Sequence, residues 1–263
     1  MKRASTVLIT SFVWVIGYLF IGGGLSKPAC AENHVESTME DRVMVALQVE
    51  MTELQKWVPE VMQIAPAPKG PFTGANLYIA FMDVLLAQDA QGKPYEGGIY
   101  RNAVFVVPVK HKTTGEMVLL VIDGLTSNPE NVPGAYKKFK LATIRRNLNY
   151  SFSGAKAGKG SDDWQCKDKS GVLIDFHVGY ERALPMRAKP VQKIYSAAEP
   201  TFYRIYKTDY LVDLVKSVPA KLDRSKDYRL KVSMPKLAKL FGGTEQLVAI
   251  VLFPTYVREV FLP

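Results

Sequence analysis

A short basic segment carries the strongest chemical signal in the sequence. Five cationic residues fall within ten positions, in Lys137-Lys138-Phe139-Lys140 and the following Arg145-Arg146. A lysine attacks a carbonyl group only as the neutral amine, and its ordinary pKa is about 10.4. Burial in apolar surroundings or a neighbouring cation lowers that pKa. The segment therefore indicates either amine chemistry on a carbonyl compound or a solvated edge strand whose lysines prevent pairing with another sheet.

The other residue types that could do chemistry form no recognisable site. The three histidines stand far apart, at positions 34, 111 and 177, whereas metal ligands converge and usually have a readable spacing. Residues 154–161 (GAKAGKGS) are not a phosphate-binding loop, because a glycine separates the last lysine from the serine. The Gly-x-Ser-x-Gly motif of serine hydrolases does not occur. We therefore expect neither a metal nor a cofactor.

The composition excludes several classes of protein. Of the 263 residues, 48% are hydrophobic and 22% are charged, which is incompatible with a disordered chain or a multi-pass membrane protein. The net charge is +9, but the cations are spread along the chain, so we expect no nucleic-acid partner. With two cysteines in all, the chain cannot form a disulfide framework or a cysteine-built zinc site.

Residues 1–31 have the pattern of a secretory signal peptide. Lys2 and Arg3 precede an uncharged apolar stretch over residues 7–25, and Ala29-Cys30-Ala31 supplies the small residues of a cleavage site. We expect a protein that is exported to the periplasm or secreted, with a mature N-terminus at Glu32. The alternative is an uncleaved membrane anchor, since about 20 apolar residues can cross a bilayer.

Apolar runs of strand length recur along residues 32–263. We expect strands at 43–49, 100–109, 117–122, 171–180, 247–253 and 256–262, and a long apolar run covers 77–86. A short helix is expected to start near Thr52 and to end before Pro59. Residues 154–171 are rich in glycine, serine and charge, which predicts an exposed loop. Many strands with few helices predict a mainly β (α+β) domain, either a barrel or a sandwich.

Five segments, in the same order along the chain, resemble the acetoacetate decarboxylase family. Residues 54–60 (LQKWVPE) resemble its helix ending in Val-Pro-Glu, and 100–109 (YRNAVFVVPV) its Tyr-x-Glu strand ending in Ile-Pro-Val. Residues 120–123 (LVID) are similar to its Tyr-Leu-Asp strand, and 135–142 (AYKKFKLA) to its Pro-Lys-Lys-Leu-Ala segment. Residues 247–262 resemble its closing strands. The resemblance covers roughly residues 40–263.

This resemblance implies a fold, a reaction and a set of site residues. The fold is a β-rich cone or barrel around an apolar pocket. In the family, the first lysine of the pair forms a Schiff base with a keto acid, and the second lysine lowers the pKa of the first. Transferred to this chain, the nucleophile is Lys138 or Lys137. The substrate-binding residues that the resemblance implies are Tyr100, Asn102, Phe139 and Lys140.

The sequence also departs from the family pattern. Asn102 replaces the glutamate of the Tyr-x-Glu strand, so an amide stands where a carboxylate could move protons. Asn131-Val132-Pro133 replaces the Gly-Arg-Glu triplet before the lysines. Depending on the alignment, Lys137, Lys138 or Phe139 takes the place of the nucleophile. Because strand residues alternate between two faces, a slip of one residue exchanges a reactive amine for an apolar plug.

Two functions remain open from the sequence. The first is a Schiff-base lyase of the decarboxylase type that acts on a small keto acid. The second is an exported binding protein without catalysis that keeps the pocket for a small apolar or carboxylate ligand. Both expect a small-molecule partner. Because proteins of this fold commonly assemble, the resemblance is also compatible with a homo-oligomer.

Overall fold

The computed structural model describes residues 32–131, 136, 139–151 and 158–263, and most of them lie in two β-sheets. The larger sheet has eleven strands in the order β2-β4-β3-β1-β15-β12-β11-β5-β6, and β10 and β13 pair with β12. Its strands are β1 (Asn33–Gln48), β2 (Met62–Ile64), β3 (Leu77–Asp89), β4 (Tyr100–His111), β5 (Met117–Thr126), β6 (Lys140–Leu141), β10 (Met186–Ala188), β11 (Val191–Ser196), β12 (Glu199–Ser217), β13 (Leu222–Asp223) and β15 (Gln246–Leu262).

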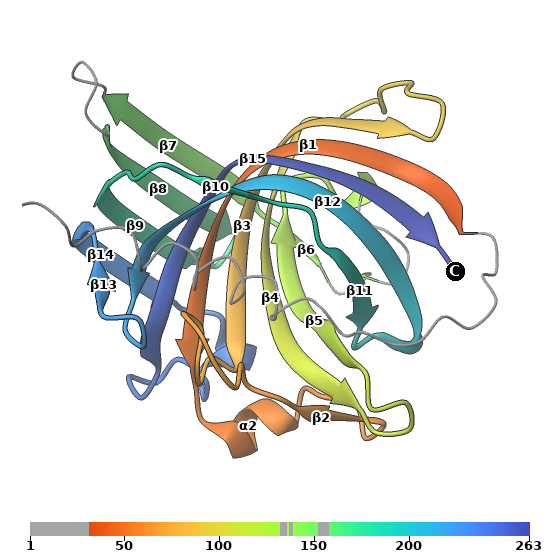
Figure 1. Cartoon of the computed structure of the whole chain (residues 1–263), viewed down its shortest axis with the longest axis horizontal. Coiled ribbons are helices and arrows are strands. Elements are labelled where there is room, and N and C mark those ends of the chain that lie inside the picture. The colour runs from red at the N-terminus through yellow and green to blue at the C-terminus, as the bar shows by residue number, and fades with distance from the viewer. Residues whose placement is uncertain (1–31, 132–135, 137–138, 152–157) are drawn as a thin grey trace, which may run out of the picture.

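The larger sheet closes on itself as a seven-strand barrel (Figure 1). Closure comes from the pairing of β4 with β5, which completes the ring β4-β3-β1-β15-β12-β11-β5. Neighbours in the ring are antiparallel except β11 and β5, which are parallel. This closed, mainly β architecture confirms the fold predicted from the sequence.

The strands of the barrel present different side chains to the inside and the outside. Ile79 and Phe81 of β3, Phe105 of β4 and Leu120 of β5 point outward, and each has 0% of its surface exposed. Successive residues of a strand point to opposite faces, so the residues between them face the barrel interior. A continuous apolar run such as 77–86 arises because both faces of β3 are covered.

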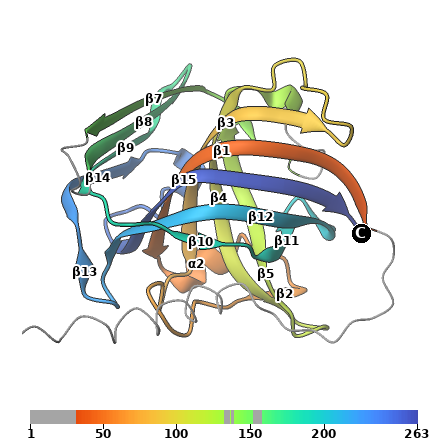
Figure 2. The ribbon, with the colours of Figure 1, turned by 45° about the horizontal axis from the view of Figure 1, so that its top comes forward.

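A second sheet covers part of the outer face of the barrel (Figure 2). Its four antiparallel strands are β7 (Thr143–Ser151), β8 (Lys159–Asp168), β9 (Gly171–Glu181) and β14 (Ser225–Val232), in the order β14-β9-β8-β7. The Phe81 ring of the barrel lies 5.5 Å from Trp164 of β8 and 4.9 Å from Phe176 of β9, centroid to centroid. These rings form the centre of the main hydrophobic core.

The sequence prediction of an exposed loop over residues 154–171 was wrong for most of that range. Residues 159–168 form β8, and its Trp164 and Cys166 are 1% and 0% exposed. Burial alternates with the polar neighbours Gln165 and Lys167, as expected for a strand with one covered face. The high content of glycine, serine and charge concealed this alternation. Residues 152–157 lie outside the described part of the chain.

Helical structure is short among the described residues. It comprises α2 (Met51–Gln55) and the 3₁₀ turns η1 (Pro129–Asn131) and η3 (Pro235–Leu237). The expected helix near Thr52 is confirmed, but its N-cap is Glu50, whose carboxylate accepts hydrogen bonds from two backbone N–H groups of the first turn. In the part of the chain that the structure describes, no helix is long and apolar enough to cross a membrane.

Arg146 helps to join the two sheets, whereas Arg145 is exposed on β7. The Arg146 side chain is 5% exposed and contacts Asp162 of β8 and Asp41 of β1, each at 2.7 Å, and Asp83 of β3 at 3.4 Å. Its guanidinium group also lies over Trp164, with its carbon 5.0 Å from the ring centroid. This arginine therefore belongs to the junction between the sheets and not to a reactive cluster.

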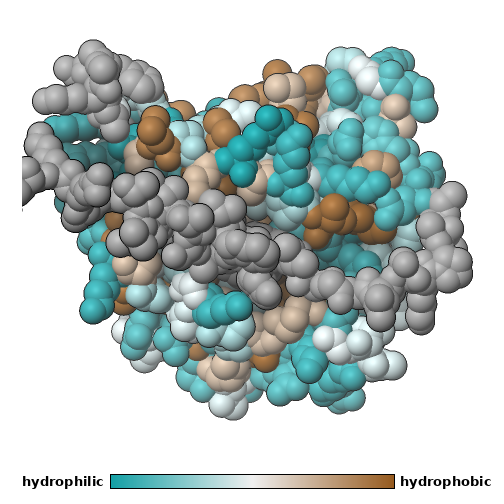
Figure 3. Space-filling view, in the orientation of Figure 1, coloured by the Kyte–Doolittle hydropathy of each residue, from teal (hydrophilic) through white to brown (hydrophobic). Residues whose placement is uncertain are grey.

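On the face shown in Figure 3, hydrophilic side chains predominate among the described residues and hydrophobic ones are scattered between them. The described residues with large exposed hydrophobic side chains come from many different elements. Scattered exposure of this kind is normal for a globular protein. The apolar surface that bears on function is therefore the one inside the barrel.

Candidate functional site

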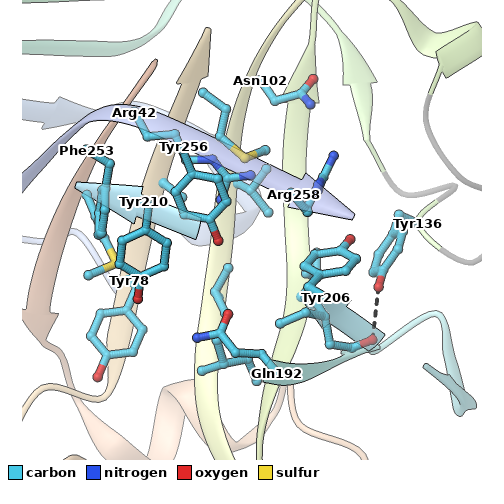
Figure 4. Close-up of a pocket in the computed structure, with 18 of the residues that line it drawn as sticks. Arg42, Tyr78, Asn102, Tyr136, Gln192, Tyr206, Tyr210, Phe253, Tyr256 and Arg258 are labelled. Atoms are coloured by element: carbon cyan, nitrogen blue, oxygen red, sulfur yellow. Dashed lines mark hydrogen bonds between the residues drawn. The ribbon is translucent and has the colours of Figure 1, made fainter. Parts of the chain in front are cut away.

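The barrel encloses a cavity of about 140 Å³, which opens to solvent. Figure 4 shows its lining side chains, with Asn102 and Gln192 at opposite ends of the group. Every strand of the barrel ring contributes to this lining. The lining residues are Glu36, Arg42, Val43, Met44, Tyr78, Ala80, Met82, Tyr100, Asn102, Val104, Val106, Leu119, Val121, Asn131, Tyr136, Phe139, Gln192, Ile194, Tyr206, Tyr210, Phe253, Tyr256 and Arg258.

A polar layer crosses one side of the cavity. The strand register places Arg42 of β1 opposite Met82 of β3, and Met82 opposite Asn102 of β4. All three side chains line the cavity. Neighbouring strands are about 4.8 Å apart, so the backbones of Arg42 and Asn102 are about two strand spacings apart. The Arg42 guanidinium group lies over Tyr256 of β15, on the other side of β1.

A buried carboxylate holds the two arginines of the cavity. Glu40 accepts a hydrogen bond from Arg42 Nε at 2.5 Å and one from the Thr38 hydroxyl at 2.5 Å, and its Oε1 lies 3.2 Å from Arg258 Nη2. Burial raises the pKa of Glu40, but Arg42 and Arg258 outweigh that effect and lower it to about 2. Glu40 is therefore ionised at neutral pH and fixes both guanidinium groups.

A second carboxylate extends this network. Glu36 Oε1 lies 3.2 Å from Arg258 Nη2, and Glu36 Oε2 lies 3.7 Å from Arg204 Nη1. Arg204 is not among the residues that line the cavity, so the two arginines of the cavity are matched by Glu36 and Glu40. A buried charge is costly unless it is paired, and this pairing holds both guanidinium groups at the cavity wall.

Two buried polar atoms of the layer lack a partner within the described part of the chain. They are Arg42 Nη2 and Asn102 Oδ1. The Arg42 guanidinium carbon lies 3.6 Å from the centroid of the Tyr256 ring, so the ring holds the group in place. An unmade hydrogen bond at a buried donor costs about 1–3 kcal/mol. A ligand that accepts a hydrogen bond from Arg42 would remove this cost, which favours its binding.

Tyrosine hydroxyls supply further neutral donors around the cavity. Burial raises the pKa of Tyr100 and of Tyr210 above the ordinary value for tyrosine. Burial likewise raises the pKa of Tyr136, whose hydroxyl donates to the Ile194 carbonyl oxygen at 3.0 Å. Below pH 10 these hydroxyl groups are therefore protonated and carry no negative charge that would repel a bound anion.

The residues predicted from the sequence occupy different positions. Tyr100, Asn102 and Phe139 all line the cavity. Lys140 is exposed on β6 and is not among the lining residues. Lys137 and Lys138 lie outside the described residues. The structure thus brings three of the six predicted residues together at one cavity.

The Phe139 ring depends on a glycine of the neighbouring strand. A Cβ atom at Gly124 of β5 would lie 2.6 Å from a carbon of this ring, which is closer than real contacts allow. The ring therefore occupies the space that a side chain at position 124 would need. This contact fixes Phe139 against the barrel wall.

The sequence reasoning missed Arg42, Arg258 and Glu40. For Arg258 the available signal was a charged residue in the mostly apolar strand β15, whereas Glu40 and Arg42 stand in a polar part of β1 that gives no such signal. Glu40 and Arg42 stand two positions apart in β1, so they face the same side. The positions of Arg42 and Asn102 on either side of Met82 follow from the order of the strands, which the sequence does not show.

Among the described residues, no group of three or more histidine, cysteine, aspartate or glutamate side chains is placed to hold a metal ion. The cavity itself is lined by arginine, amide, tyrosine and apolar groups.

Comparison with known proteins finds likeness in structure but not in sequence. Neither a protein-family model nor a curated protein matches the chain. The enduracididine biosynthesis enzyme MppR superposes with a TM-score of 0.56 at 11% identity, over 93% of this chain and 97% of the enzyme. An acetoacetate decarboxylase-like enzyme from Sphingomonas wittichii RW1 gives 0.54 at 12% identity, over 91% of this chain and 98% of that one.

A third solved structure extends this likeness. Acetoacetate decarboxylase from Legionella pneumophila superposes with a TM-score of 0.50 at 12% identity, over 100% of this chain and 96% of the enzyme. At such identities the likeness concerns the fold alone. Since the superpositions cover nearly all of both chains, the similarity includes the barrel and the second sheet together.

Proposed function

We propose that this chain, which has the acetoacetate decarboxylase-like fold, binds a small organic carboxylate inside its barrel. The observation that carries the proposal is Arg42 Nη2, a buried donor on a cavity-lining guanidinium group that has no hydrogen-bond partner among the described residues. A carboxylate would accept this unused hydrogen bond and bring its negative charge beside Arg42 and Arg258. Charge-assisted hydrogen bonds of this kind are about twice as strong as neutral ones.

Asn102 suits the same ligand. Its amide carries both donor and acceptor atoms, and its Oδ1 is buried without a partner within the described part of the chain. The unpartnered Oδ1 is an acceptor and would take a hydrogen bond from a hydroxyl group of the ligand, while the amide nitrogen can donate to its carboxylate or to an oxo oxygen. A structural relative supports this choice, since MppR has been seen in complex with pyruvate, a small oxo acid.

Calorimetric titration tests the proposal with an acid and its neutral analogue, 3-methylbutanoate and 3-methylbutanamide. We expect the acid to bind and Arg42→Met to weaken it about ten- to a hundredfold, because a hydrogen bond to a charged group contributes about 1.5–3 kcal/mol. Arg42→Lys keeps the charge and should recover part of the affinity. Arg229→Met is the matched control, because Arg229 pairs with Asp175 on the second sheet. Equal binding of the acid and the amide would refute the proposal.

A Schiff-base lyase acting on a small keto acid is the second candidate. Tyr136 and Phe139 both line the cavity, and Lys137 and Lys138 are the two residues between them in the sequence. In this mechanism the lysine nitrogen attacks the keto carbon and water leaves. The protonated imine then takes up the electron pair of the bond that breaks when carbon dioxide departs, and a proton replaces the carboxylate.

The side chains at the positions where an acid could transfer protons favour a binding protein without catalysis. Asn102 stands where the family has a glutamate, and Glu36 is engaged by Arg258 and Arg204. Neither residue offers an unpaired carboxylic acid for proton transfer. Among the described lining residues, the polar groups hold an anion better than they move protons.

Borohydride trapping separates the two candidates. The protein is incubated with 3-oxobutanoate, reduced, digested and analysed by mass spectrometry. An adduct on Lys138 or Lys137, lost in Lys138→Met or Lys137→Met, would establish the lyase step. Lys140→Met is the matched control, because Lys140 is exposed on β6. Saturable binding of the acid without an adduct would establish a binding protein.

A further inference from the structure

The inner face of the barrel carries apolar surface that the described side chains cover only in part. Ala80, Val106, Leu119 and Met44 face the interior and line the cavity, yet each is only partly buried. Their neighbours on the outer face of the same strands, such as Ile79 and Leu120, are 0% exposed. The exposed part of the inner wall is therefore unused apolar area, which gains free energy when a ligand covers it.

This apolar wall lies to one side of the charged layer. The register places Met44 opposite Ala80, one step along the barrel from the Arg42–Met82 pair. Val106 lies four residues from Asn102 on β4, which corresponds to about 13 Å of strand. A ligand whose carboxylate is at Arg42 and Asn102 would thus extend its other end past Ala80 toward Val106 and Leu119.

The size of the cavity limits the ligand. Its volume of about 140 Å³ is similar to that of an engineered apolar cavity of about 150 Å³ that binds benzene. This volume includes the space beside Arg42 and Asn102, so an acid with a compact branched or ring-shaped body would fill it together with its carboxylate. Acids of two to four carbons would leave much of the apolar wall exposed.

The residue at position 80 has the smallest side chain on this wall. Its neighbours along the inner face of β3 are Tyr78 and Met82, both much larger. The alanine leaves a recess between them on β3. Among the described lining residues, the polar groups outside the charged layer include tyrosine hydroxyls and the amides of Asn131 and Gln192.

We infer that the ligand is a monocarboxylate with a branched or phenyl body, and that Ala80 is the specificity-determining residue that admits this body. The inference rests on the proposed carboxylate site and adds the chemical class of the remainder of the ligand. The head group is held by Arg42 and Asn102, and the body covers the inner wall beside Ala80, Val106 and Leu119.

A titration series tests the inference on the full protein. The probes are acetate, pyruvate and 3-oxobutanoate as short acids, and 4-methyl-2-oxopentanoate and 3-phenylpropanoate as long ones. Each buried methylene contributes about 0.8 kcal/mol, so we expect the long acids to bind at least about tenfold more tightly than the short ones. Equal affinity across the series would overturn the inference.

Ala80→Leu should reverse this preference, because three added carbons would fill the recess. We expect the long acids to lose about tenfold or more in affinity while the short acids change by less than about twofold. Ala198→Leu is the matched control, since Ala198 is exposed in the turn between β11 and β12. Unchanged binding of the long acids by Ala80→Leu would overturn the role of this residue.

A second variant covers the case in which Ala80→Leu does not fold. Val104→Ala enlarges the same recess from the neighbouring strand β4, because the register pairs Val104 with Ala80 and both line the cavity, and it should raise the affinity for 4-phenylbutanoate relative to 3-phenylpropanoate. No change in that ratio would count against the recess as the seat of the ligand body.

The outcomes distinguish this inference from the carboxylate site. If acids of every length bind equally and Arg42→Met weakens all of them, the carboxylate site stands and the recess does not. If 3-phenylpropanamide binds as tightly as 3-phenylpropanoate, the recess stands and the carboxylate site does not. Failure of every probe to bind would overturn both.

Discussion

The two faces of the barrel wall use the same strands for different purposes. On the outer face, Phe81 and Phe105 are fully buried, and Phe81 packs against the rings of the second sheet. On the inner face, Ala80 and Val106, one residue away on the same strands, are only partly buried and line a cavity. The outer face thus stabilises the fold, and the inner face keeps surface available for a ligand.

The period of two residues in a strand makes this division possible. Because neighbouring side chains point to opposite faces, a substitution at one position changes stability and a substitution at the next changes binding. The two properties can therefore be altered separately on β3, β4 and β5. The experiments that follow test this separation.

The largest effect is expected on the outer face. Phe81→Ala should lower the free energy of unfolding by about 3–5 kcal/mol, because it removes a fully buried ring between Trp164 and Phe176. Urea unfolding followed by tryptophan fluorescence measures the change. Met82→Ala, one residue further on the inner face, is the comparison and should cost less. An equal loss in both variants would contradict the division between the faces.

A smaller effect is expected from the buried carboxylate of the charged layer. The pKa of Glu40 is about 2 in the folded protein and about 4.3 in an unfolded chain. Between these values the unfolded state binds more protons, so the contribution of Glu40 is complete above about pH 4.5 and is lost as the pH falls toward 2. Glu40→Gln should therefore cost about 2–3 kcal/mol at pH 7.

The same pair of proteins gives the control for that prediction. The difference in free energy of unfolding between wild type and Glu40→Gln should shrink as the pH is lowered from 5 to 2.5, because the wild-type carboxylate loses its advantage. A difference that stays constant over this range would show that Glu40 is not held ionised by Arg42 and Arg258.

The smallest effect is expected where Phe139 meets the wall. Gly124→Ala places a Cβ within 2.6 Å of the Phe139 ring, so the ring must shift and stability should fall by about 1 kcal/mol. Because Phe139 lines the cavity, the affinity for 3-phenylpropanoate should change as well. Phe139→Leu combined with Gly124→Ala should restore stability. Failure of the double variant to recover would assign the cost to the strand backbone.

Much of the fold could be predicted from the sequence. The hairpin of β4 and β5 and the closing strand β15 were visible as apolar runs, because strands covered on both faces are continuously hydrophobic. The strand β8 was missed because glycine and charge around it resemble a loop, although Trp164 and Cys166 alternate with polar residues. The composition of this segment suggested a loop, and the alternation of apolar and polar residues becomes clear only once one face of β8 is known to be covered.

The site was predictable in part. Tyr100 and Asn102 share a strand face two residues apart, so their common position on the cavity follows from the pattern of β4. The contributions of Arg42 and Arg258 could not be predicted, because β1 and β15 become neighbours only in the barrel. Their charges meet at Glu40 across that pairing.

The pairing of β1 with β15 has a consequence for how the molecule comes into being. Asn33 is matched with Leu262, so β1 acquires this partner only after more than 220 further residues have been synthesised. Arg258 and Tyr256 arrive with that last strand. A nascent chain without β15 therefore has neither a closed barrel nor a complete carboxylate site. Contacts of such long sequence separation predict slow folding. The capacity to hold a ligand should appear late and together with the native structure.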